Sequence, residues 1–367
     1  MTSFIYENKH WPDFTWDDQR IINLFGDVRN LQGRLLGRMD SLGFEYRNAA
    51  VLDTMTLDVI KSSEIEGVYL NLEQVRSSFA RRLAIDLAGM VESDRRVEGS
   101  VDIMIDATRN YKLPLTVERL FDWHSSLFPS GRSGIRKITP AAWRTDLRGP
   151  MQVVSGVIGK EKVHFQAPPA NLVPGEMERF VEWFNGDDNT DLVLKSAGAH
   201  LWFVTIHPFE DGNGRIARAL AEMILARSDE SAQRFYSMSA RIRTERKEYY
   251  RILEKTQNGG LDITDWLLWY LNCLMNALRS TESILARVIH KATFSRNNAD
   301  KILNARQRTM LNTLLDGFDG KLTTSKWAKI SKCSSDTALR DIQDLMTKGI
   351  IKKAEEAGGR STNYKLV

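Results

Sequence analysis

Cysteine is scarce in this chain of 367 residues, which contains only Cys273 and Cys333. These two residues lie in separate regions and show no metal-ligand spacing, so the sequence argues against structural disulfides and cysteine-based metal sites. No apolar run approaches the roughly 20 residues that a membrane helix needs. The first ten residues lack the basic-then-apolar pattern of a signal peptide. We therefore expect a cytoplasmic protein without a membrane partner.

The common nucleotide-binding sequences are absent as well. The chain contains neither a Walker sequence nor a Gly-x-Gly-x-x-Gly fingerprint, which excludes the best-known phosphate loops. Its composition is that of an ordinary globular protein, with 42% hydrophobic and 27% charged residues. A chain of this length has room for two or three domains.

Charge is distributed unevenly along the chain. Residues 287–367 contain 16 Lys and Arg against 8 Asp and Glu, whereas the rest of the chain contains 35 against 39. The net charge of +4 therefore arises in the C-terminal part.

The most informative stretch is residues 207–218, with the sequence HPFEDGNGRIAR. It lies between two apolar segments, residues 192–206 and 216–226, that both read as buried helices. Gly212 and Gly214 permit positive φ, so consecutive backbone N–H groups can turn inward and form an anion nest at the start of the second helix. The stretch is therefore a helix–loop–helix hinge suited to phosphate.

Side chains in the same stretch strengthen this interpretation. Arg215 and Arg218 share one face of the first helical turn, where cations oppose the helix dipole at a cost of about 0.3–1 kcal/mol each. A bound polyphosphate would convert that repulsion into attraction. Asp211 offers an oxygen ligand for Mg²⁺, and His207 can take a proton near neutral pH. A lone histidine would more often be a capping or core residue, but these neighbours favour phosphate chemistry.

Every fixed position of His-Pro-Phe-x-Asp-Gly-Asn-Gly-Arg-x-x-Arg is matched, which resembles the signature of the Fic-domain family. The resemblance implies transfer of AMP from ATP to a tyrosine, threonine or serine hydroxyl of target proteins and of the protein itself. It makes His207 the general base and Asp211 the ligand of Mg²⁺ or Mn²⁺. It also implies that the nucleotide is held by Gly212, Asn213, Gly214, Arg215, Ile216, Ala217 and Arg218, with the two arginines on the outer phosphates.

Two helices are predicted near the N-terminus, one over residues 15–47 and one over residues 48–65. The second ends in Ser62-Ser63-Glu64-Ile65-Glu66-Gly67, where Ser62 and Glu66 share a face and Gly67 can form a left-handed cap. Taken alone, this is a polar helix end.

Beside the signature, that helix end resembles the family's inhibitory motif. The resemblance implies that Glu66 pairs with Arg218 and occupies the position that the ATP γ-phosphate needs. Inhibition could act in cis or across a dimer. In some relatives the same glutamate supports removal of AMP, and this alternative stays open.

Residues 151–156 and 162–166 are β-prone runs around a turn at residues 159–162, after a loop at residues 129–150 that we expect to be exposed. The resemblance implies that this hairpin is the flap that clamps a target segment beside the histidine. The flap residues would be Val153, Val154, Val163, His164 and Phe165. A surface hairpin without function is the alternative.

Further helices are predicted at residues 67–109, 174–185, 246–257 and 263–285. His124 is expected to be a core residue. In the helix at residues 246–257, Tyr249 should pack inward, whereas the resemblance places Tyr250 and Gln257 on the adenine side of the pocket. Ordinary packing is the alternative for Gln257. Val204, one turn ahead of His207, would also line the pocket.

A linker is predicted at residues 293–298. Beyond it, the sequence predicts three helices and two strands, and the first of these helices begins near Ile302. This arrangement resembles a winged helix. The third helix would offer Ser335, Thr337, Arg340 and Gln343 to a DNA groove, with Lys326 and Lys329 near phosphates. Protein recognition or dimerisation is the alternative, because Asp336, Asp341 and Asp344 dilute the charge of this helix.

We therefore expect a mainly α protein with a Fic helical core, a β-hairpin flap, an N-terminal helical region and a C-terminal winged helix. The expected domains are residues 1–95, 96–290 and 297–367. The expected function is that of an autoinhibited protein adenylyltransferase, with ATP, Mg²⁺, protein targets and a homodimer partner. The alternatives are a DNA-binding regulator with a Fic sensor domain, or a related transferase of another phosphate group.

Overall fold

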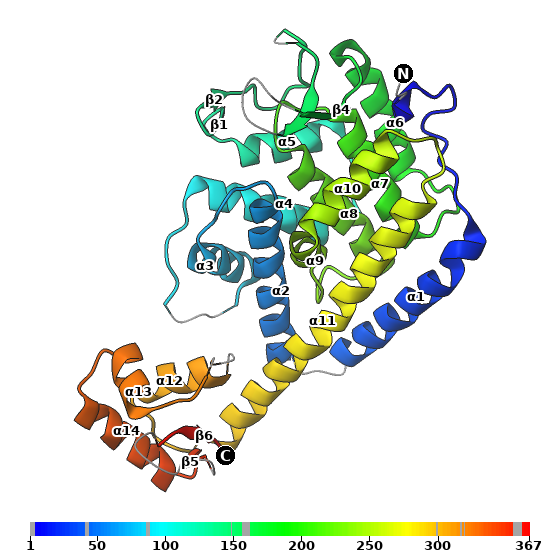
Figure 1. The fold of residues 1–367 in the computed structure, drawn as a ribbon. Helices are drawn as coiled ribbons and strands as arrows, with labels where there is room; N and C mark the ends of the chain where they lie inside the picture. The colour runs from blue at the N-terminus through cyan, green and yellow to red at the C-terminus, as the bar shows by residue number, and fades with distance from the viewer. Residues whose placement is uncertain are drawn as a thin grey trace. The chain divides into compact units, whose positions relative to one another are not determined.

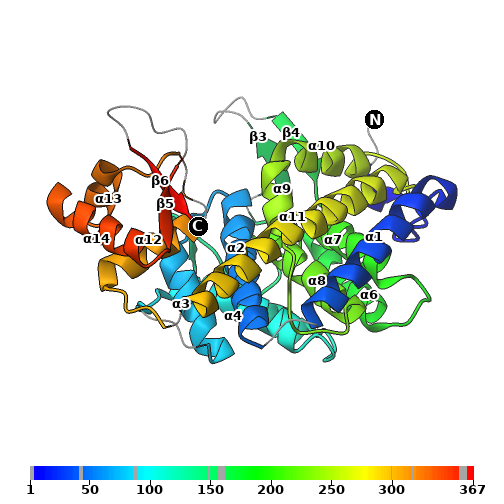
Figure 2. The same ribbon diagram turned by 90° about the horizontal axis from the view of Figure 1, so that it is seen from below.

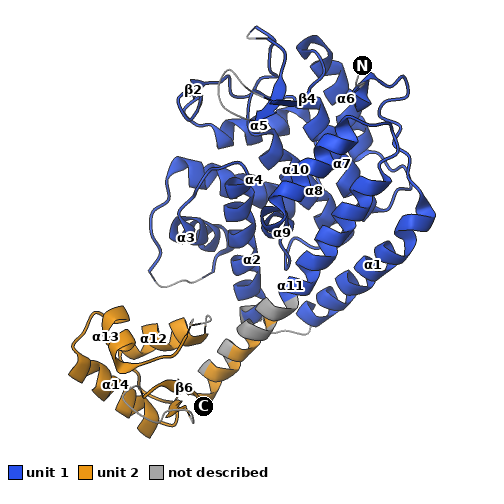
Figure 3. Ribbon diagram, in the orientation of Figure 1, with its two compact units in different colours: residues 1–281 blue, residues 282–367 orange. Residues whose placement is uncertain are grey.

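The computed structural model describes all residues except 1–3, 41–43, 86–88, 148, 156–161, 299, 316, 317, 319 and 355–361. The described part is mainly helical, as predicted (Figure 1). It divides into two compact units, residues 1–281 and 282–367 (Figure 3). None of the described helices combines the length and the apolar character needed to cross a membrane.

The N-terminal region begins with the short helix η1 (Ile5–Glu7), followed by α1 (Asp18–Asp40) and α2 (Phe44–Ile65). The prediction of one helix over residues 15–47 was wrong, because α1 ends at Asp40 and α2 begins at Phe44. The sequence places Gly43 directly before α2, and glycine is a poor helix former. Arg20 of α1 pairs with Asp265 at 2.9 Å, and α1 and α11 lie side by side (Figures 1 and 2).

Helices α3 (Leu72–Leu83) and α4 (Arg95–Arg109) replace the single helix predicted over residues 67–109, which was wrong. Each helix begins at its own N-cap: the Asn71 side chain accepts from the N–H of Gln74, and Asp94 accepts from the N–H groups of Arg96 and Val97. Capping residues of this kind start helices and do not continue them.

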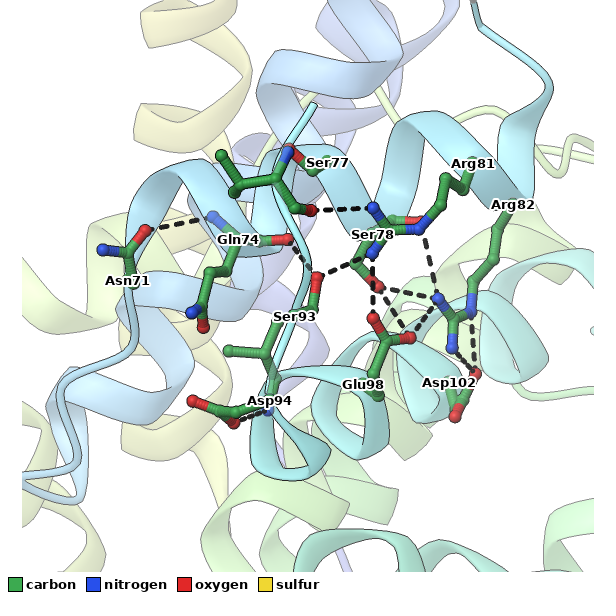
Figure 4. Close-up of polar contacts among 12 residues, drawn as sticks. Asn71, Gln74, Ser77, Ser78, Arg81, Arg82, Ser93, Asp94, Glu98 and Asp102 are labelled. Atoms are coloured by element: carbon green, nitrogen blue, oxygen red, sulfur yellow. Dashed lines mark hydrogen bonds and ion pairs between the residues drawn. The ribbon is translucent and has the colours of Figure 1, made fainter. Parts of the chain in front are cut away.

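Helices α3 and α4 are joined by a polar network (Figure 4). Arg82 donates through Nε to Asp102 at 2.8 Å, and Arg81 donates to Glu98 at 3.1 Å. Ser78 also donates to Glu98. These contacts fix the segment that follows α2 against the beginning of α4.

Six helices build the centre of the first unit: α5 (Val117–Leu127), α6 (Val173–Asn185), α7 (Leu192–Ile206), α8 (Asn213–Ser228), α9 (Met238–Thr244) and α10 (Arg246–Gln257). Nearly every side chain of α7 is buried, as its apolar sequence predicts. Helix α8 contacts α7, α2, α4 and α5, so the turn between α7 and α8 is held by the surrounding core.

Two small hairpins and the short helix η2 (Ala170–Leu172) lie between α5 and α6: β1 (Arg132–Ser133) with β2 (Arg136–Lys137), and β3 (Gln152–Ser155) with β4 (Lys162–Gln166). The predicted hairpin is present, and most of its predicted turn lies outside the described residues. The expectation that residues 129–150 form an exposed loop was wrong in part. Ile138 and Arg144 are buried, and they anchor this segment to the core.

The second unit includes the last part of α11 (Thr264–Asn297), and this helix contradicts the linker predicted at residues 293–298. That stretch contains neither Gly nor Pro, so it carries no strong helix-ending signal. The unit contains α12 (Ala305–Leu315), α13 (Thr324–Ile330), α14 (Ser335–Thr347) and the paired strands β5 (Ile351–Lys353) and β6 (Tyr364–Leu366).

The arrangement of the second unit is that of a winged helix, as predicted. Trp327, Ile342, Leu345 and Ile351 belong to its buried core. Ile302 precedes α12 and is 86% exposed, so its predicted place in the first helix was wrong.

Candidate active site

His207 ends α7 with a left-handed backbone conformation, φ 51° and ψ 57°, and its N–H donates to the Phe203 carbonyl. Nδ1 lies 3.3 Å from the Val204 carbonyl, which is an acceptor, so Nδ1 carries the hydrogen and Nε2 is left as a proton acceptor. Burial lowers the pKa of His207 to about 4, although the bond to Val204 raises it. The imidazole is therefore neutral at pH 7, and its Nε2 carries no proton.

Arg144 holds the histidine in place from a distant part of the chain. Its side chain is fully buried, and its Nε donates to the His207 carbonyl at 2.7 Å. Nη2 donates to the carbonyls of Pro168 and Ile206, and Nη1 pairs with Asp146 at 3.1 Å. The sequence reasoning missed this residue, because its main partners are backbone carbonyls that carry no sequence signal.

The loop after His207 is closed by its own residues. The Asn213 side chain accepts from the Phe209 N–H at 2.9 Å and donates to the Phe209 carbonyl at 2.8 Å. The Phe209 ring stacks on His124, with centroids 4.1 Å apart. His124 is fully buried, and burial lowers its pKa to about 4. Because the amide of Asn213 is engaged in closing the loop, only its backbone N–H is available to an anion.

The two glycines of the loop lie where an added Cβ would meet a neighbouring side chain. Gly212 has φ 84°, and a Cβ there would lie 2.9 Å from the Phe128 ring. A Cβ on Gly214 would lie 2.1 Å from a carboxylate oxygen of Glu66. The side chains of Ile216 and Ala217 are fully buried, so only the backbone groups of these residues are available to a ligand in the loop.

Asp211 is the residue of this site best suited to a cation. Its Oδ2 accepts from Ser133 and its Oδ1 from the N–H of Gly212, while Arg215 lies 3.8 Å away. The carboxylate is 40% exposed and keeps lone pairs for a metal. Within the described residues no cluster of three His, Cys, Asp or Glu side chains forms a metal site. One carboxylate completed by phosphate oxygens is the ligand set that Mg²⁺ commonly takes.

The two arginines of α8 lie in different surroundings. The Arg215 guanidinium packs 5.0 Å above the Phe128 ring, and burial lowers its pKa. Arg218 is 2% exposed, and although burial opposes its charge, Glu66 holds the pKa of Arg218 above its usual value. Arg215 Nε and Arg218 Nη1 are buried and have no hydrogen-bond partner among the described residues. Two buried unpartnered donors fit an anionic ligand such as phosphate.

The end of α2 reaches this site. Glu66 Oε1 accepts from Arg218 Nη2 at 2.8 Å, and Ser62 accepts from Arg218 Nε at 2.8 Å through its hydroxyl and from Nη2 at 2.9 Å through its carbonyl. Gly67 follows with φ 76°, the left-handed conformation that favours glycine. The structure therefore brings Ser62 of α2, and Glu66 directly after this helix, into contact with the arginine that the sequence singled out.

Helices α9 and α10 fix the end of α2. Arg246 donates through Nε to the Ile65 carbonyl at 2.8 Å, and the Tyr250 hydroxyl lies 3.5 Å from the same oxygen. Arg243 pairs with Glu64 at 3.3 Å. Tyr250 is partly exposed, and burial raises the pKa of its hydroxyl.

Residues predicted to surround the adenine differ in exposure. Gln257 is buried and donates to the Thr205 hydroxyl at 3.2 Å, so its amide joins α10 to α7. The Val204 side chain is 7% exposed, and its carbonyl serves His207. Tyr249 packs inward, with its hydroxyl 2.9 Å from His200.

The hairpin residues point in two directions. Val154 and Val163 are 48% and 46% exposed, and Val153 is half-buried. Phe165 is buried. His164 lies 2.8 Å from Glu254 of α10, and its carbonyl accepts from Asn258. The hairpin is thus anchored on one side, and two valines are exposed on the other.

The loop of residues 207–218 lies within a match to a known family. Residues 114–225 match the Fic/DOC family, and residues 4–85 match a family described as a domain of unknown function, DUF4172. A crystal structure of a Fic family protein from Desulfovibrio desulfuricans G20 covers 98% of this chain and 98% of its own, with 20% identity and a TM-score of 0.57. This likeness shows a Fic-like fold.

Protein adenylyltransferase Fic from Drosophila persimilis is 26% identical over 266 residues, which is 69% of this chain and 46% of that protein. The protein of the same name from Drosophila melanogaster is 26% identical over 229 residues, 60% of this chain and 40% of its own length. The chain thus spans less than half the length of these curated relatives, to which it is distantly related.

Proposed function

We propose that this chain, whose residues 114–225 match the Fic/DOC family, is a cytoplasmic protein adenylyltransferase that transfers AMP from ATP to hydroxyl side chains. The acceptors would be tyrosine, threonine or serine residues of target proteins and of the chain itself. The observation that carries the proposal is the neutral His207 with an available Nε2, beside two buried arginines with unpartnered donors.

In the proposed reaction, His207 Nε2 takes the proton of the acceptor hydroxyl while the hydroxyl oxygen forms a bond to the α-phosphorus of ATP. The bond between the α-phosphorus and the bridging oxygen breaks, and pyrophosphate leaves. General-base assistance of this kind is worth about 10²–10⁴ in rate. Arg215, Arg218 and the first N–H groups of α8 would hold the outer phosphates. Asp211 would hold Mg²⁺ or Mn²⁺, which offsets the negative charge of the phosphates.

The pair of Glu66 and Arg218 supports autoinhibition as part of this proposal. Glu66 occupies one donor of Arg218, and its carboxylate would repel a phosphate at the same place. ATP would therefore bind in a pose unsuited to transfer until Glu66 moves. The contact lies within one chain, and a homodimer remains part of the proposal as a second route of control.

The β3–β4 hairpin is proposed as the surface for the target segment. Val154 and Val163 are exposed, and among the described strands β3 and β4 pair only with each other. An exposed strand edge can add a peptide as a further strand, which brings a hydroxyl beside the histidine. Residues 1–95 would then regulate, residues 96–290 would catalyse, and residues 297–367 would recognise a further partner.

The test uses ATP labelled at the α-phosphate. Glu66→Gly should label itself faster than the wild type, and Glu66→Gly/His207→Ala should lose the label. Glu66→Gly/His10→Ala is the matched control, because His10 is an exposed histidine outside the site. Equal label with and without His207 would refute the enzyme proposal. Equal label with and without Glu66 would refute only the autoinhibition.

Intact mass of the labelled protein separates AMP from other groups, including a phosphate or a phosphocholine. Failure of every variant to transfer AMP while ATP still binds would favour a regulator that uses the Fic domain as a sensor.

A further inference from the structure

Two carboxylates on α14 are paired with cations of the second unit, of which Asp341 is buried and Asp344 is exposed. Asp341 is 5% exposed and accepts from Arg306 at 2.8 and 3.0 Å and from Asn304 at 2.9 Å. Asp344 accepts from Gln307 at 2.7 Å and pairs with Lys348. Burial raises the pKa of Asp341, but its bonds to Arg306 and Asn304 hold it below its usual value. The expectation that Asp336, Asp341 and Asp344 dilute the charge of this helix stays a prediction, and two of the three carboxylates are paired with cations.

The outer face of α14 carries polar groups without partners. Arg340 and Gln343 are exposed and lie three residues apart, so they share a face. No hydrogen bond or ion pair engages either side chain within the described residues. Arginine and glutamine are the side chains that make bidentate bonds to guanine and adenine in the major groove. Ser335 is exposed and Thr337 is half-buried at the N-terminal end of the same helix, where backbone N–H groups favour phosphate.

The β5–β6 hairpin places two lysines directly opposite each other. Lys352 and Lys365 are partners in the strand register, and both are exposed. Like charges at directly opposite positions destabilise a strand pair. In the described part of the chain no carboxylate pairs with either of them. A polyanion bound at this hairpin would remove the repulsion.

A third group of exposed lysines lies on and after α13. Lys326, Lys329 and Lys332 form no ion pair among the described residues, although Lys326 lies 5.3 Å over the Phe318 ring. Within the described part of α14, Asp336 is the one carboxylate without an ion pair. Exposed basic side chains are thus present on or after α13, on α14 and on the β5–β6 hairpin.

We infer that the second unit binds duplex DNA, with α14 in the major groove and the β5–β6 hairpin on the phosphate backbone. Arg340 and Gln343 contact base edges, and Lys326, Lys329, Lys352 and Lys365 contact phosphates. The inference goes beyond AMP transfer and does not depend on it, because it rests on the second unit alone.

The experiment measures binding of the full chain to a fluorescent duplex of about 30 base pairs between about 50 and 200 mM salt. Affinity should fall steeply with salt, because counterions are released from each phosphate contact. Lys352→Glu/Lys365→Glu should reduce the slope of log affinity against log salt by about 2. Asp336→Asn should instead tighten binding, since it removes the opposing charge.

Lys9→Glu/Lys137→Glu is the matched control, because it makes the same charge change at exposed lysines of the first unit. Binding that does not depend on salt, or that falls equally in the control, would overturn the inference. Equal or tighter binding to an RNA duplex would overturn the assignment to DNA, because A-form RNA closes its major groove to a helix. Unchanged thermal melting of both variants establishes that loss of binding is not loss of fold.

Discussion

Arg218 and Glu66 lie 152 positions apart in sequence, yet a guanidinium nitrogen and a carboxylate oxygen are 2.8 Å apart. The same guanidinium also bonds the hydroxyl and the carbonyl of Ser62. A single arginine of α8 therefore connects the phosphate loop to the last turn of α2, so a change in α2 can alter the site directly.

Ser62→Ala should weaken inhibition without removing it. The variant leaves Arg218 Nε buried without its hydroxyl partner, which costs about 1–3 kcal/mol of folding stability. Self-labelling from α-labelled ATP should rise above the wild type but stay below Glu66→Gly. Ser63→Ala is the control, because Ser63 is also buried and its hydroxyl does not bond Arg218. Equal label in the Ser62 and Ser63 variants would show that the hydroxyl does not restrain the site.

Gly214→Ala should be harmful only while Glu66 is present. The new Cβ would lie 2.1 Å from Glu66 Oε1, so the carboxylate must leave its place. Chemical denaturation of the two single variants and the double variant measures the coupling as a double-mutant cycle. We expect Gly214→Ala to lower stability in the wild type and to have a smaller effect in Glu66→Gly. Equal effects in both backgrounds would contradict the close approach of Glu66 to Gly214.

Arg144→Lys should reduce transfer strongly in the Glu66→Gly background. A lysine cannot reproduce the fork that reaches the carbonyls of His207 and Pro168 and the carboxylate of Asp146. The carbonyls left unpaired should also cost about 1–3 kcal/mol of stability each. Activity per folded molecule is measured beside denaturant unfolding. A variant that loses stability but keeps full activity would show that Arg144 supports the fold and not the position of His207.

The rate of AMP transfer should not fall as the pH drops through 6.5. An ordinary histidine would lose base function below that pH, whereas burial lowers the pKa of His207 to about 4. The unfolded chain binds this proton near pH 6.5 and the folded chain only near pH 4. The contribution of His207 to stability is therefore present above pH 6.5 and is lost as pH falls toward 4. A tenfold fall in kcat/KM per pH unit just below 6.5 would contradict the prediction.

Asp211→Asn should remove the effect of Mg²⁺ on nucleotide binding. The neutral amide can still accept the hydrogen bond of Ser133 but is a poor ligand for Mg²⁺. Thermal shift with ATP, with and without Mg²⁺, measures this directly. The Mg²⁺-dependent part of the shift should disappear, and a shift equal to that of the wild type would exclude Asp211 as the ligand.

The features that could be predicted from the sequence are those encoded by neighbouring residues. The loop of residues 207–218 was visible because its chemistry is contiguous in sequence. Arg144 was not, because backbone carbonyls bind it and any residue can supply those. The starts of α3 and α4 were marked by the caps Asn71 and Asp94, but the apolar spacing of residues 67–109 outweighed them. The linker prediction failed for the opposite reason, since polar composition alone does not end a helix.

The backbone of His207 has a consequence for the design of inactive variants. With φ 51°, alanine at this position would keep a conformation that is unfavourable for a residue with a Cβ, by about 1–3 kcal/mol, whereas glycine adopts it freely. His207→Gly should therefore melt at a higher temperature than His207→Ala, with both inactive. Selection for thermal stability alone would favour glycine at this position. A histidine kept here would therefore indicate selection for the catalytic imidazole.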